Sequence, residues 1–230
     1  MCQQLKRPCL NSMATLPLFP LNVVLFPGMQ LKLHIFEERY KLMINSCIEA
    51  NEPFGVVLIK EGREVSGPIA TSFAVGCAAA ISDVQRLPLG RMNITAVGQR
   101  RFHIKDIDRS KPYLLGHVEF FIPAEDQPEL VRQYCRFLRP LVIRYLEVLT
   151  SKEDASFDPQ QIPHQPRAIA QIASILLKTD NAQKQELLAM PSLSRLLLTL
   201  VEIYRFETLL LNVRMSPPDK DFNIGPFSSN

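Results

Sequence analysis

The segment LPLFPLNVVLFPGMQLKLHIFEERY (residues 16–40) sets three prolines and three phenylalanines into a run of strand-forming residues. Proline cannot donate a hydrogen bond to a strand ladder, so it is confined to strand starts, edges and bulges. Pro17 and Pro20 therefore suit the start or the edge of a strand, and Pro27-Gly28 suits a tight turn. Apolar and polar residues alternate over 31–35, which predicts a half-buried strand after that turn.

Short strands dominate the chain up to residue 122. The predicted strands are 31–35, 55–59, 73–81, 92–97, 101–107 and 113–122, and the turn signals between them include Glu61-Gly62, residues 87–90, Gly98 and residues 110–112. Many short strands at this spacing predict a closed or nearly closed β-barrel. One helix is expected in this half, from Glu37 to Ala50, because its apolar residues recur at helical spacing and Asn51-Glu52-Pro53 then ends it.

From about Pro123 the pattern becomes helical. Apolar residues keep helical spacing over 130–145, and Pro140 inside this stretch should kink or divide the helix. Polar residues 151–165 indicate an exposed loop. A β half followed by an α half predicts an α+β fold, with one subdomain at 14–122 and a second at 123–214.

Three more residues mark predicted helix starts. Pro166 suits the first position of a helix, Asp180 with Gln183 resembles a capping box, and Ser192 suits the N-cap of a long helix ending near Arg214. Residues 1–13 are expected to form a disordered extension and residues 215–230 a flexible tail, since neither has a packing pattern.

Composition indicates a cytoplasmic globular protein. The chain has 230 residues, 47% of them hydrophobic, and a net charge of +3, far from the concentrated basic patch of a dedicated nucleic-acid binder. Its five cysteines are scattered without a C-x-x-C pair, which argues for reduced thiols and against disulfides or a zinc site. No apolar run is long enough for a membrane helix and no secretory signal is evident, so we expect no membrane association.

Few residue patterns in the sequence indicate catalysis, nucleotide binding or metal binding. Gly62 and Gly67 have phosphate-loop spacing, but Pro68-Ile69 stands where lysine and Ser/Thr are needed. Ser174 and Lys178 are an i, i+4 pair without a recognisable oxyanion hole, so a serine–lysine hydrolase is only a third hypothesis. The four histidines are isolated, and neither a metal nor a cofactor is expected.

Basic clusters leave one alternative open. Arg132, Arg136 and Arg139 share a predicted helix face, as a solvated surface or as a contact for RNA or an acidic protein. Arg100-Arg101 follows the predicted turn at Gly98. Together these observations favour a binding or scaffold module over an enzyme.

The motifs of the chain resemble those of the Lon protease N-terminal domain family over roughly residues 14–212. They are Leu16-Pro17-Leu18-Phe19-Pro20-Leu21, Val24-Leu25-Phe26-Pro27-Gly28, Leu33-His34-Ile35-Phe36-Glu37-x-Arg39-Tyr40, Phe54–Leu58, Val75-Gly76-Cys77, Gly98-x-x-Arg101-Phe102-x-Ile104, Pro112-Tyr113-Leu114, Lys184–Leu188 and Arg195-Leu196. Cys77 stands where the family usually has threonine. The resemblance implies a PUA-like β-barrel followed by a C-terminal helical bundle.

The resemblance also implies a function. In Lon proteases this domain captures unfolded or degron-bearing substrates and supports hexamer assembly, whereas the ATPase and the serine–lysine peptidase lie in later domains. We therefore expect a non-enzymatic, stand-alone module that binds unfolded proteins or peptides, or acts as an adaptor or scaffold. Its expected partners are a separate protease or chaperone, with weak self-association.

We place the predicted peptide site in the groove between barrel and helical bundle, because clefts at subdomain junctions tend to bind ligands. The candidate contacts are Phe19, Phe26, Phe36 and Arg39. Each phenylalanine is at least as compatible with a place in the core. The alternative function is RNA binding by analogy with other PUA-like folds, against which the low net charge and the absence of tryptophan count.

Overall fold

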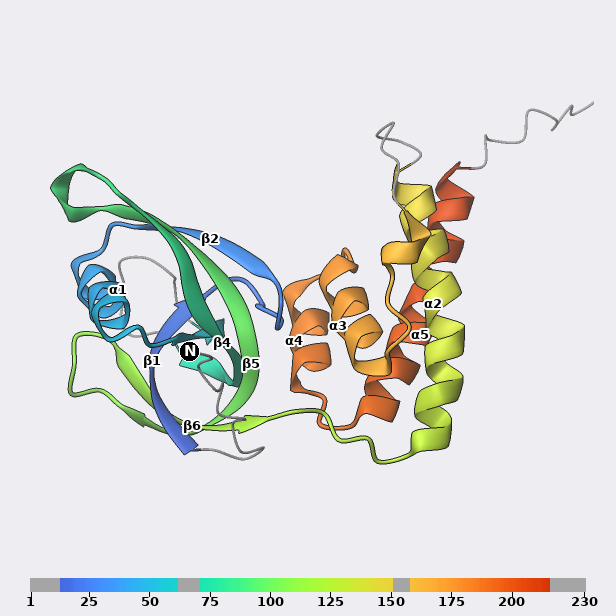
Figure 1. Ribbon diagram of the computed structural model, residues 1–230, viewed down its shortest axis with the longest axis horizontal. Coiled ribbons are helices and arrows are strands. Elements are labelled where there is room, and N and C mark those ends of the chain that lie inside the picture. The colour runs from blue at the N-terminus through green and yellow to red at the C-terminus, as the bar shows by residue number, and fades with distance from the viewer. Residues whose placement is uncertain (1–12, 62–70, 151–157, 216–230) are drawn as a thin grey trace, which may run out of the picture.

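The computed structural model describes residues 13–61, 71–150 and 158–215, arranged as a curled sheet beside a helical bundle (Figure 1). The strands are β1 (Met13–Leu21), β2 (Gln30–Ile35), β3 (Phe54–Glu61), β4 (Thr71–Arg86), β5 (Met92–Asp108) and β6 (Leu114–Phe121). The helices are α1 (Glu38–Ala50), α2 (Pro128–Thr150), α3 (Pro166–Leu176), α4 (Asn181–Ala189) and α5 (Leu193–Met215). The predicted α+β class is confirmed. The predicted extension and tail lie almost wholly outside the described residues.

The six strands form one sheet that closes on itself. Their order is β2-β5-β4-β3-β1-β6, and β6 pairs again with β5. The pairing of β1 with β3 is parallel, whereas the other pairings are antiparallel. Five strands therefore complete a ring to which β2 is added, and register shifts in three of the pairings make this barrel irregular.

Pro17 and Pro20 lie inside β1, which has a neighbour on each side in the sheet. Pairing changes side along the strand: residues 13–18 pair with β6, and residues 18–21 pair with β3. Each proline thus has a hydrogen-bonding partner strand on one side only. The predicted edge character holds locally, although the strand as a whole is not an edge strand.

Gly98 does not make the predicted turn, because β5 continues through it from residue 92 to residue 108. Its amide donates to the Met29 carbonyl at 2.9 Å, and its carbonyl accepts from the Gly28 amide at 2.8 Å. A Cβ at this position would collide with the Phe26 carbonyl oxygen. The glycine is therefore needed for a close approach of two backbones, and not for a reversal of the chain.

The turn at Pro27-Gly28 is confirmed. The Met29 amide donates to the Phe26 carbonyl at 3.0 Å, and Gly28 has φ +78°. A positive φ at the third residue, after proline, fits a type II turn. Because this turn also pairs with Gly98, it fixes the segment between β1 and β2 onto the sheet.

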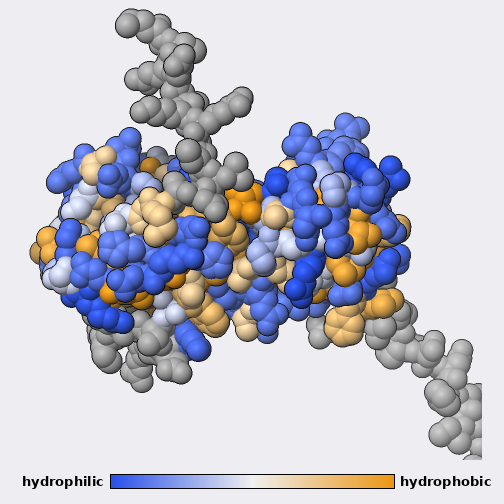
Figure 2. Space-filling model, turned by 90° about the horizontal axis from the view of Figure 1, so that it is seen from below, coloured by the Kyte–Doolittle hydropathy of each residue, from blue (hydrophilic) through white to orange (hydrophobic). Residues whose placement is uncertain are grey.

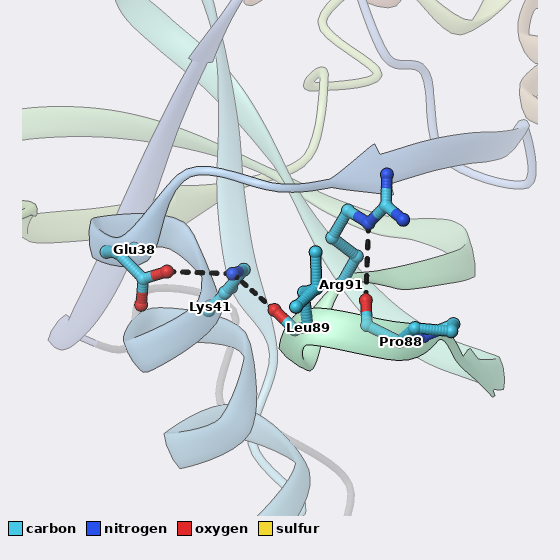
Figure 3. Close-up of polar contacts among 5 residues, drawn as sticks. All are labelled: Glu38, Lys41, Pro88, Leu89 and Arg91. Atoms are coloured by element: carbon cyan, nitrogen blue, oxygen red, sulfur yellow. Dashed lines mark hydrogen bonds and ion pairs between the residues drawn. The ribbon is translucent and has the colours of Figure 1, made fainter.

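Helix α1 packs against the sheet through a buried stripe at the predicted spacing, formed by Tyr40, Met43, Ile44 and Cys47. The helix is also tied to the distant β4–β5 hairpin (Figure 3). Lys41 Nζ pairs with Glu38 Oε1 at 2.8 Å and donates to the Leu89 carbonyl at 2.8 Å. Leu89 has φ +63°, a left-handed conformation that is unusual for leucine, and its side chain is 83% exposed.

The predicted helix starts of the second half are confirmed. α3 begins at Pro166, Asp180 Oδ1 accepts from the Gln183 amide at 2.8 Å, and Ser192 Oγ accepts from the Arg195 amide at 3.2 Å. Pro140 does not divide α2, which runs on as one helix through it. No helix in the described part of the chain is long and apolar enough to cross a membrane.

The core of the bundle receives side chains from the sheet half. Its buried cluster includes Val24 and Phe26 from the β1–β2 segment, Leu58 from β3 and Val75 from β4. Two further clusters fill the barrel, one against α1 and one formed by residues of β1, β3, β4, β5 and β6. Figure 1 shows α4 and α3 nearest the sheet, with α2 and α5 farther out.

Candidate functional site

Polar contacts fix the bundle onto the sheet. Arg101 of β5 is 5% exposed, and its Nη1 donates to the Leu187 and Leu188 carbonyls at 3.3 and 3.0 Å. These carbonyls belong to the last turn of α4, where the helix dipole favours a cation. Gln185 Nε2 of the same helix donates to the Val75 carbonyl of β4 at 3.0 Å.

A cavity of about 190 Å³ lies beside this contact, at the junction predicted for the peptide site. The residues around it come from β5, the end of β6, α3 and α5. They are Pro27, Gln99, Arg100, Arg101, Phe121, Ile122, Pro123, Arg167, Ala170, Gln171, Leu193 and Leu196. Figure 2 shows the molecule as two lobes with apolar surface at the waist between them.

A β-bulge shapes the sheet side of the cavity. Ala78 pairs with Arg100 and Ala79 pairs with Gly98, so Gln99 is an extra residue in β5. Bulges locally change the direction in which side chains point. Successive residues Gln99, Arg100 and Arg101 all line the cavity in consequence.

The cavity carries positive charge. Burial lowers the pKa of the Arg101 guanidinium to about 10, so this group remains charged at neutral pH. Arg167 pairs with Glu125 at 3.0 Å and donates to the Pro123 carbonyl, and the Arg100 guanidinium lies 4.2 Å from the centre of the Phe120 ring. The lining includes three arginines and no carboxylate from the described residues.

Two of the four predicted contacts, Phe19 and Phe26, are buried, which is the core position that the sequence also allowed. Phe26 is 1% exposed and lies in the bundle core, next to Pro27 of the cavity wall. Phe19 is 6% exposed and stacks on Tyr40 with 4.1 Å between ring centres. Both side chains lie among apolar residues, where their burial stabilises the fold.

Phe36 lies at a second, smaller pocket, away from the junction, and Arg39 lies beside that pocket. This pocket of about 150 Å³ is lined by the end of β1, β2 and the start of α1, with Phe19, Phe36 and Tyr40 among its residues. Phe36 is 45% exposed. Arg39 pairs with Glu37 at 2.8 Å and lies over the Tyr40 ring at 4.7 Å. The structure thus brings Phe19 and Phe36 to one pocket, puts Arg39 beside it, and leaves Phe26 elsewhere.

The junction residues were only partly recognisable in the sequence. Arg100 and Arg101 stood out as a basic pair, and Arg101 belongs to a family motif, but nothing in the pattern showed that α4 covers it. The sequence pattern gives no signal for Ile122 and Gln171 as site residues. Only the packing of β6 and α3 around the same space brings them together.

The residues considered for catalysis are buried or hydrogen-bonded within the fold. Ser174 is fully buried and its hydroxyl donates to the Ala170 carbonyl at 2.7 Å, while the Lys178 amide donates to Tyr145. Burial raises the pKa of Cys47 to about 11 and that of Cys77 to about 12, so both thiols stay protonated. Within the described residues no three His, Cys, Asp or Glu side chains converge as metal ligands would.

Comparisons with known proteins agree with this architecture. The N-terminal domain of a Lon protease from the Mycobacterium avium complex aligns with 84% of this chain and 98% of its own at a TM-score of 0.65 and 20% identity. A Lon N-terminal domain protein from Xanthomonas campestris aligns with 82% of this chain and 98% of its own at a TM-score of 0.62 and 25% identity.

Among curated relatives, the Lon protease of Koribacter versatilis is 27% identical over 76% of this chain but only 22% of its own length. That of Parabacteroides distasonis is 30% identical over 45% of this chain and 13% of its own. The chain therefore spans about a fifth or less of these relatives. The family model of the ATP-dependent protease La (LON) substrate-binding domain matches residues 15–204, and the chain belongs to this family of substrate-binding domains.

Proposed function

We propose that the chain is a non-enzymatic module that binds unfolded or degron-bearing polypeptides in the junction cavity between sheet and bundle. The cavity itself carries the proposal, because it is a concave space between subdomains with apolar walls and a few polar groups. Ile122 at its edge is 46% exposed, which leaves an apolar side chain available to a ligand. The small pocket lined by Phe36, with Arg39 beside it, is the second proposed contact.

A module of this kind delivers polypeptides to other proteins, so we propose a separate cytoplasmic protease or chaperone as its partner. The matched family model covers a substrate-binding domain and neither an ATPase nor a peptidase. The chain would then act as an adaptor, with binding and release as its whole cycle.

The charges of the described residues do not favour the RNA alternative. Arg132 pairs with Glu129, and Arg139 donates to the Ile162 and Pro159 carbonyls at 3.2 and 2.9 Å. Two of the three arginines on the α2 face therefore have partners within the protein. Phosphate recognition would need these groups free to meet a backbone.

The test is binding of unfolded model polypeptides, measured by fluorescence anisotropy with the full chain. Ile122→Asp is expected to weaken binding at least about tenfold, since it sets a charge into an apolar contact. The matched control is Phe137→Asp on α2, which is equally exposed at 44% but lies outside the cavity. Equal affinities of the two variants, or no binding by the wild type, would refute the proposal.

Phe36→Ala tests the second contact in the same assay. A loss of affinity only in this variant would move the site to the pocket between β2 and α1. Salt-dependent binding of an RNA oligonucleotide without polypeptide binding would instead support the alternative function.

A further inference from the structure

Arg101 keeps part of its guanidinium free inside the junction cavity. Its described hydrogen bonds both use Nη1, toward Leu187 and Leu188. Among buried side-chain nitrogens and oxygens of the described residues, only Gln185 Oε1 lacks both a partner and solvent contact. No hydrogen bond within the described part of the protein uses Nε or Nη2 of Arg101. Since neither atom is among the fully buried atoms without a partner, both are accessible to solvent. Arg101 lines the cavity.

No described carboxylate compensates this buried charge. Arg101 forms no ion pair within residues 13–61, 71–150 and 158–215, and the carbonyls of α4 meet only one of its nitrogens. Arg100 on the same wall adds a second cation, stacked on Phe120. A desolvated guanidinium without an anion is costly, and an incoming anion would offset that cost.

One wall of the cavity is apolar. Phe121, Ile122, Leu193 and Leu196 form the wall contributed by β6 and α5. A ligand that matches both parts must join an anion directly to an apolar group. A volume of about 190 Å³ suits one amino-acid residue.

We propose that the junction cavity binds the C-terminal residue of a polypeptide, with its terminal carboxylate on Nε and Nη2 of Arg101 and its apolar side chain against Ile122 and Leu196. The planar fork of arginine matches the two oxygens of a carboxylate. A chain end fits because only one backbone direction has to leave the cavity. This inference rests on the proposed function and narrows it to polypeptides with an apolar C-terminal residue.

The first test compares two fluorescent decapeptides that end in leucine and differ only in a free or amidated C-terminus. With the full chain, we expect the free acid to bind about tenfold tighter or more, as one charge-assisted hydrogen-bonded pair provides. Equal affinities for both peptides would overturn the carboxylate inference and leave the proposed function standing. Absence of binding by both would overturn the two together.

The second test locates the site without disturbing Arg101, whose replacement would also remove its bonds to α4. Gln171→Glu sets a carboxylate on the cavity wall and is expected to abolish the preference for the free acid. The control Gln133→Glu makes the same charge change on the exposed surface of α2, outside the cavity, and should keep it. An unchanged preference in Gln171→Glu would place the carboxylate elsewhere and refute the inference.

Two competitors separate a chain end from other anions. An amidated peptide with an internal glutamate should not displace the free-acid peptide, and neither should inorganic phosphate at equal concentration. Displacement by the internal glutamate would refute recognition of the terminus. Displacement by phosphate would show a general anion site and would likewise refute it.

Discussion

Gly98 lies where the backbone of β5 crosses the turn at Gly28, and the two segments exchange hydrogen bonds of 2.8 and 2.9 Å. We expect Gly98→Ala to destabilise the protein by roughly 2–3 kcal/mol, because its Cβ would force the Phe26 carbonyl away. Urea denaturation monitored by circular dichroism measures this as a lower midpoint with an unchanged slope.

The control is Gly90→Ala. Gly90 has a positive φ, +68°, but a Cβ added there would lie 3.8 Å from its nearest neighbour beyond the adjoining residues. This variant should lose only about 1 kcal/mol, from the left-handed backbone alone. If both variants lose the same stability, close backbone approach is not what Gly98 provides.

Leu89 is a second residue with an unfavourable backbone conformation. Its left-handed conformation is one that asparagine adopts far more readily, and its side chain is 83% exposed. We expect Leu89→Asn to stabilise the protein by about 0.5–1 kcal/mol, with the Lys41 contact to the carbonyl retained. Leu42→Asn, at an exposed leucine of α1, should instead destabilise it slightly, since asparagine is the poorer helix former. A lower urea midpoint for Leu89→Asn would contradict the strain argument.

At the scale of elements, the sequence predicted where strands and helices occur better than where they end. The stretches 92–97 and 101–107 were predicted as two strands, but they are halves of β5. Gly98 usually signals a turn, and only the approach of Phe26, far away along the chain, explains why the strand continues. Local signals sufficed for two helix starts. The side chain of Asp180 bonds to an amide only three residues away, and Pro166 suits the first position of a helix through its own ring.

Asp126 joins the segment after β6 to the start of α5. Its carboxylate accepts from the Ser192 hydroxyl at 2.8 Å and from the Ser194 hydroxyl at 3.0 Å, and the Ser192 bond is the main cause of the lowered pKa of Asp126. A lowered acid pKa adds stability above the ordinary value of 3.8, and this part is lost as the pH falls through the folded value.

We therefore expect Asp126→Asn to lower stability at pH 7 and the difference from wild type to shrink as the pH falls, so that the two urea midpoints converge on acidification. Ser194→Ala removes one donor to the same carboxylate and should show part of the same convergence. Curves that remain parallel from pH 7 to pH 2.5 would show that this contact adds nothing to the start of α5.

At the scale of the whole molecule, the sequence indicated a site between two halves but not which residues face it. Apolar periodicity tells on which side of a strand or helix a residue lies, and Phe26 is in neither. Its neighbours in the bundle core come from helices more than a hundred residues later, such as Leu193 and Leu196. From the sequence of β5 alone, Arg101 is expected to be a surface cation, but α4 covers it in the structure. Junction residues depend on long-range packing, which single-sequence patterns do not encode.

The shared core predicts that sheet and bundle unfold together. Phe26 leaves the β1–β2 segment to fill the bundle core, where it is 1% exposed beside Val24. Phe26→Ala should cost about 4 kcal/mol, as large cavities in cores do. Hydrogen exchange should then accelerate about a thousandfold in the slowest amides of both β3 and α5, because both open only by global unfolding.

Phe36→Ala is the matched control, since Phe36 belongs to the same opening segment but is 45% exposed. Its loss of stability should stay below about 1 kcal/mol, with exchange in β3 and α5 changed less than about tenfold. Faster exchange in α5 alone after Phe26→Ala would mean that the bundle opens independently of the sheet. The cavity at their junction would then be variable in shape, whereas joint acceleration means that it is held rigid by the same residue that links the two halves.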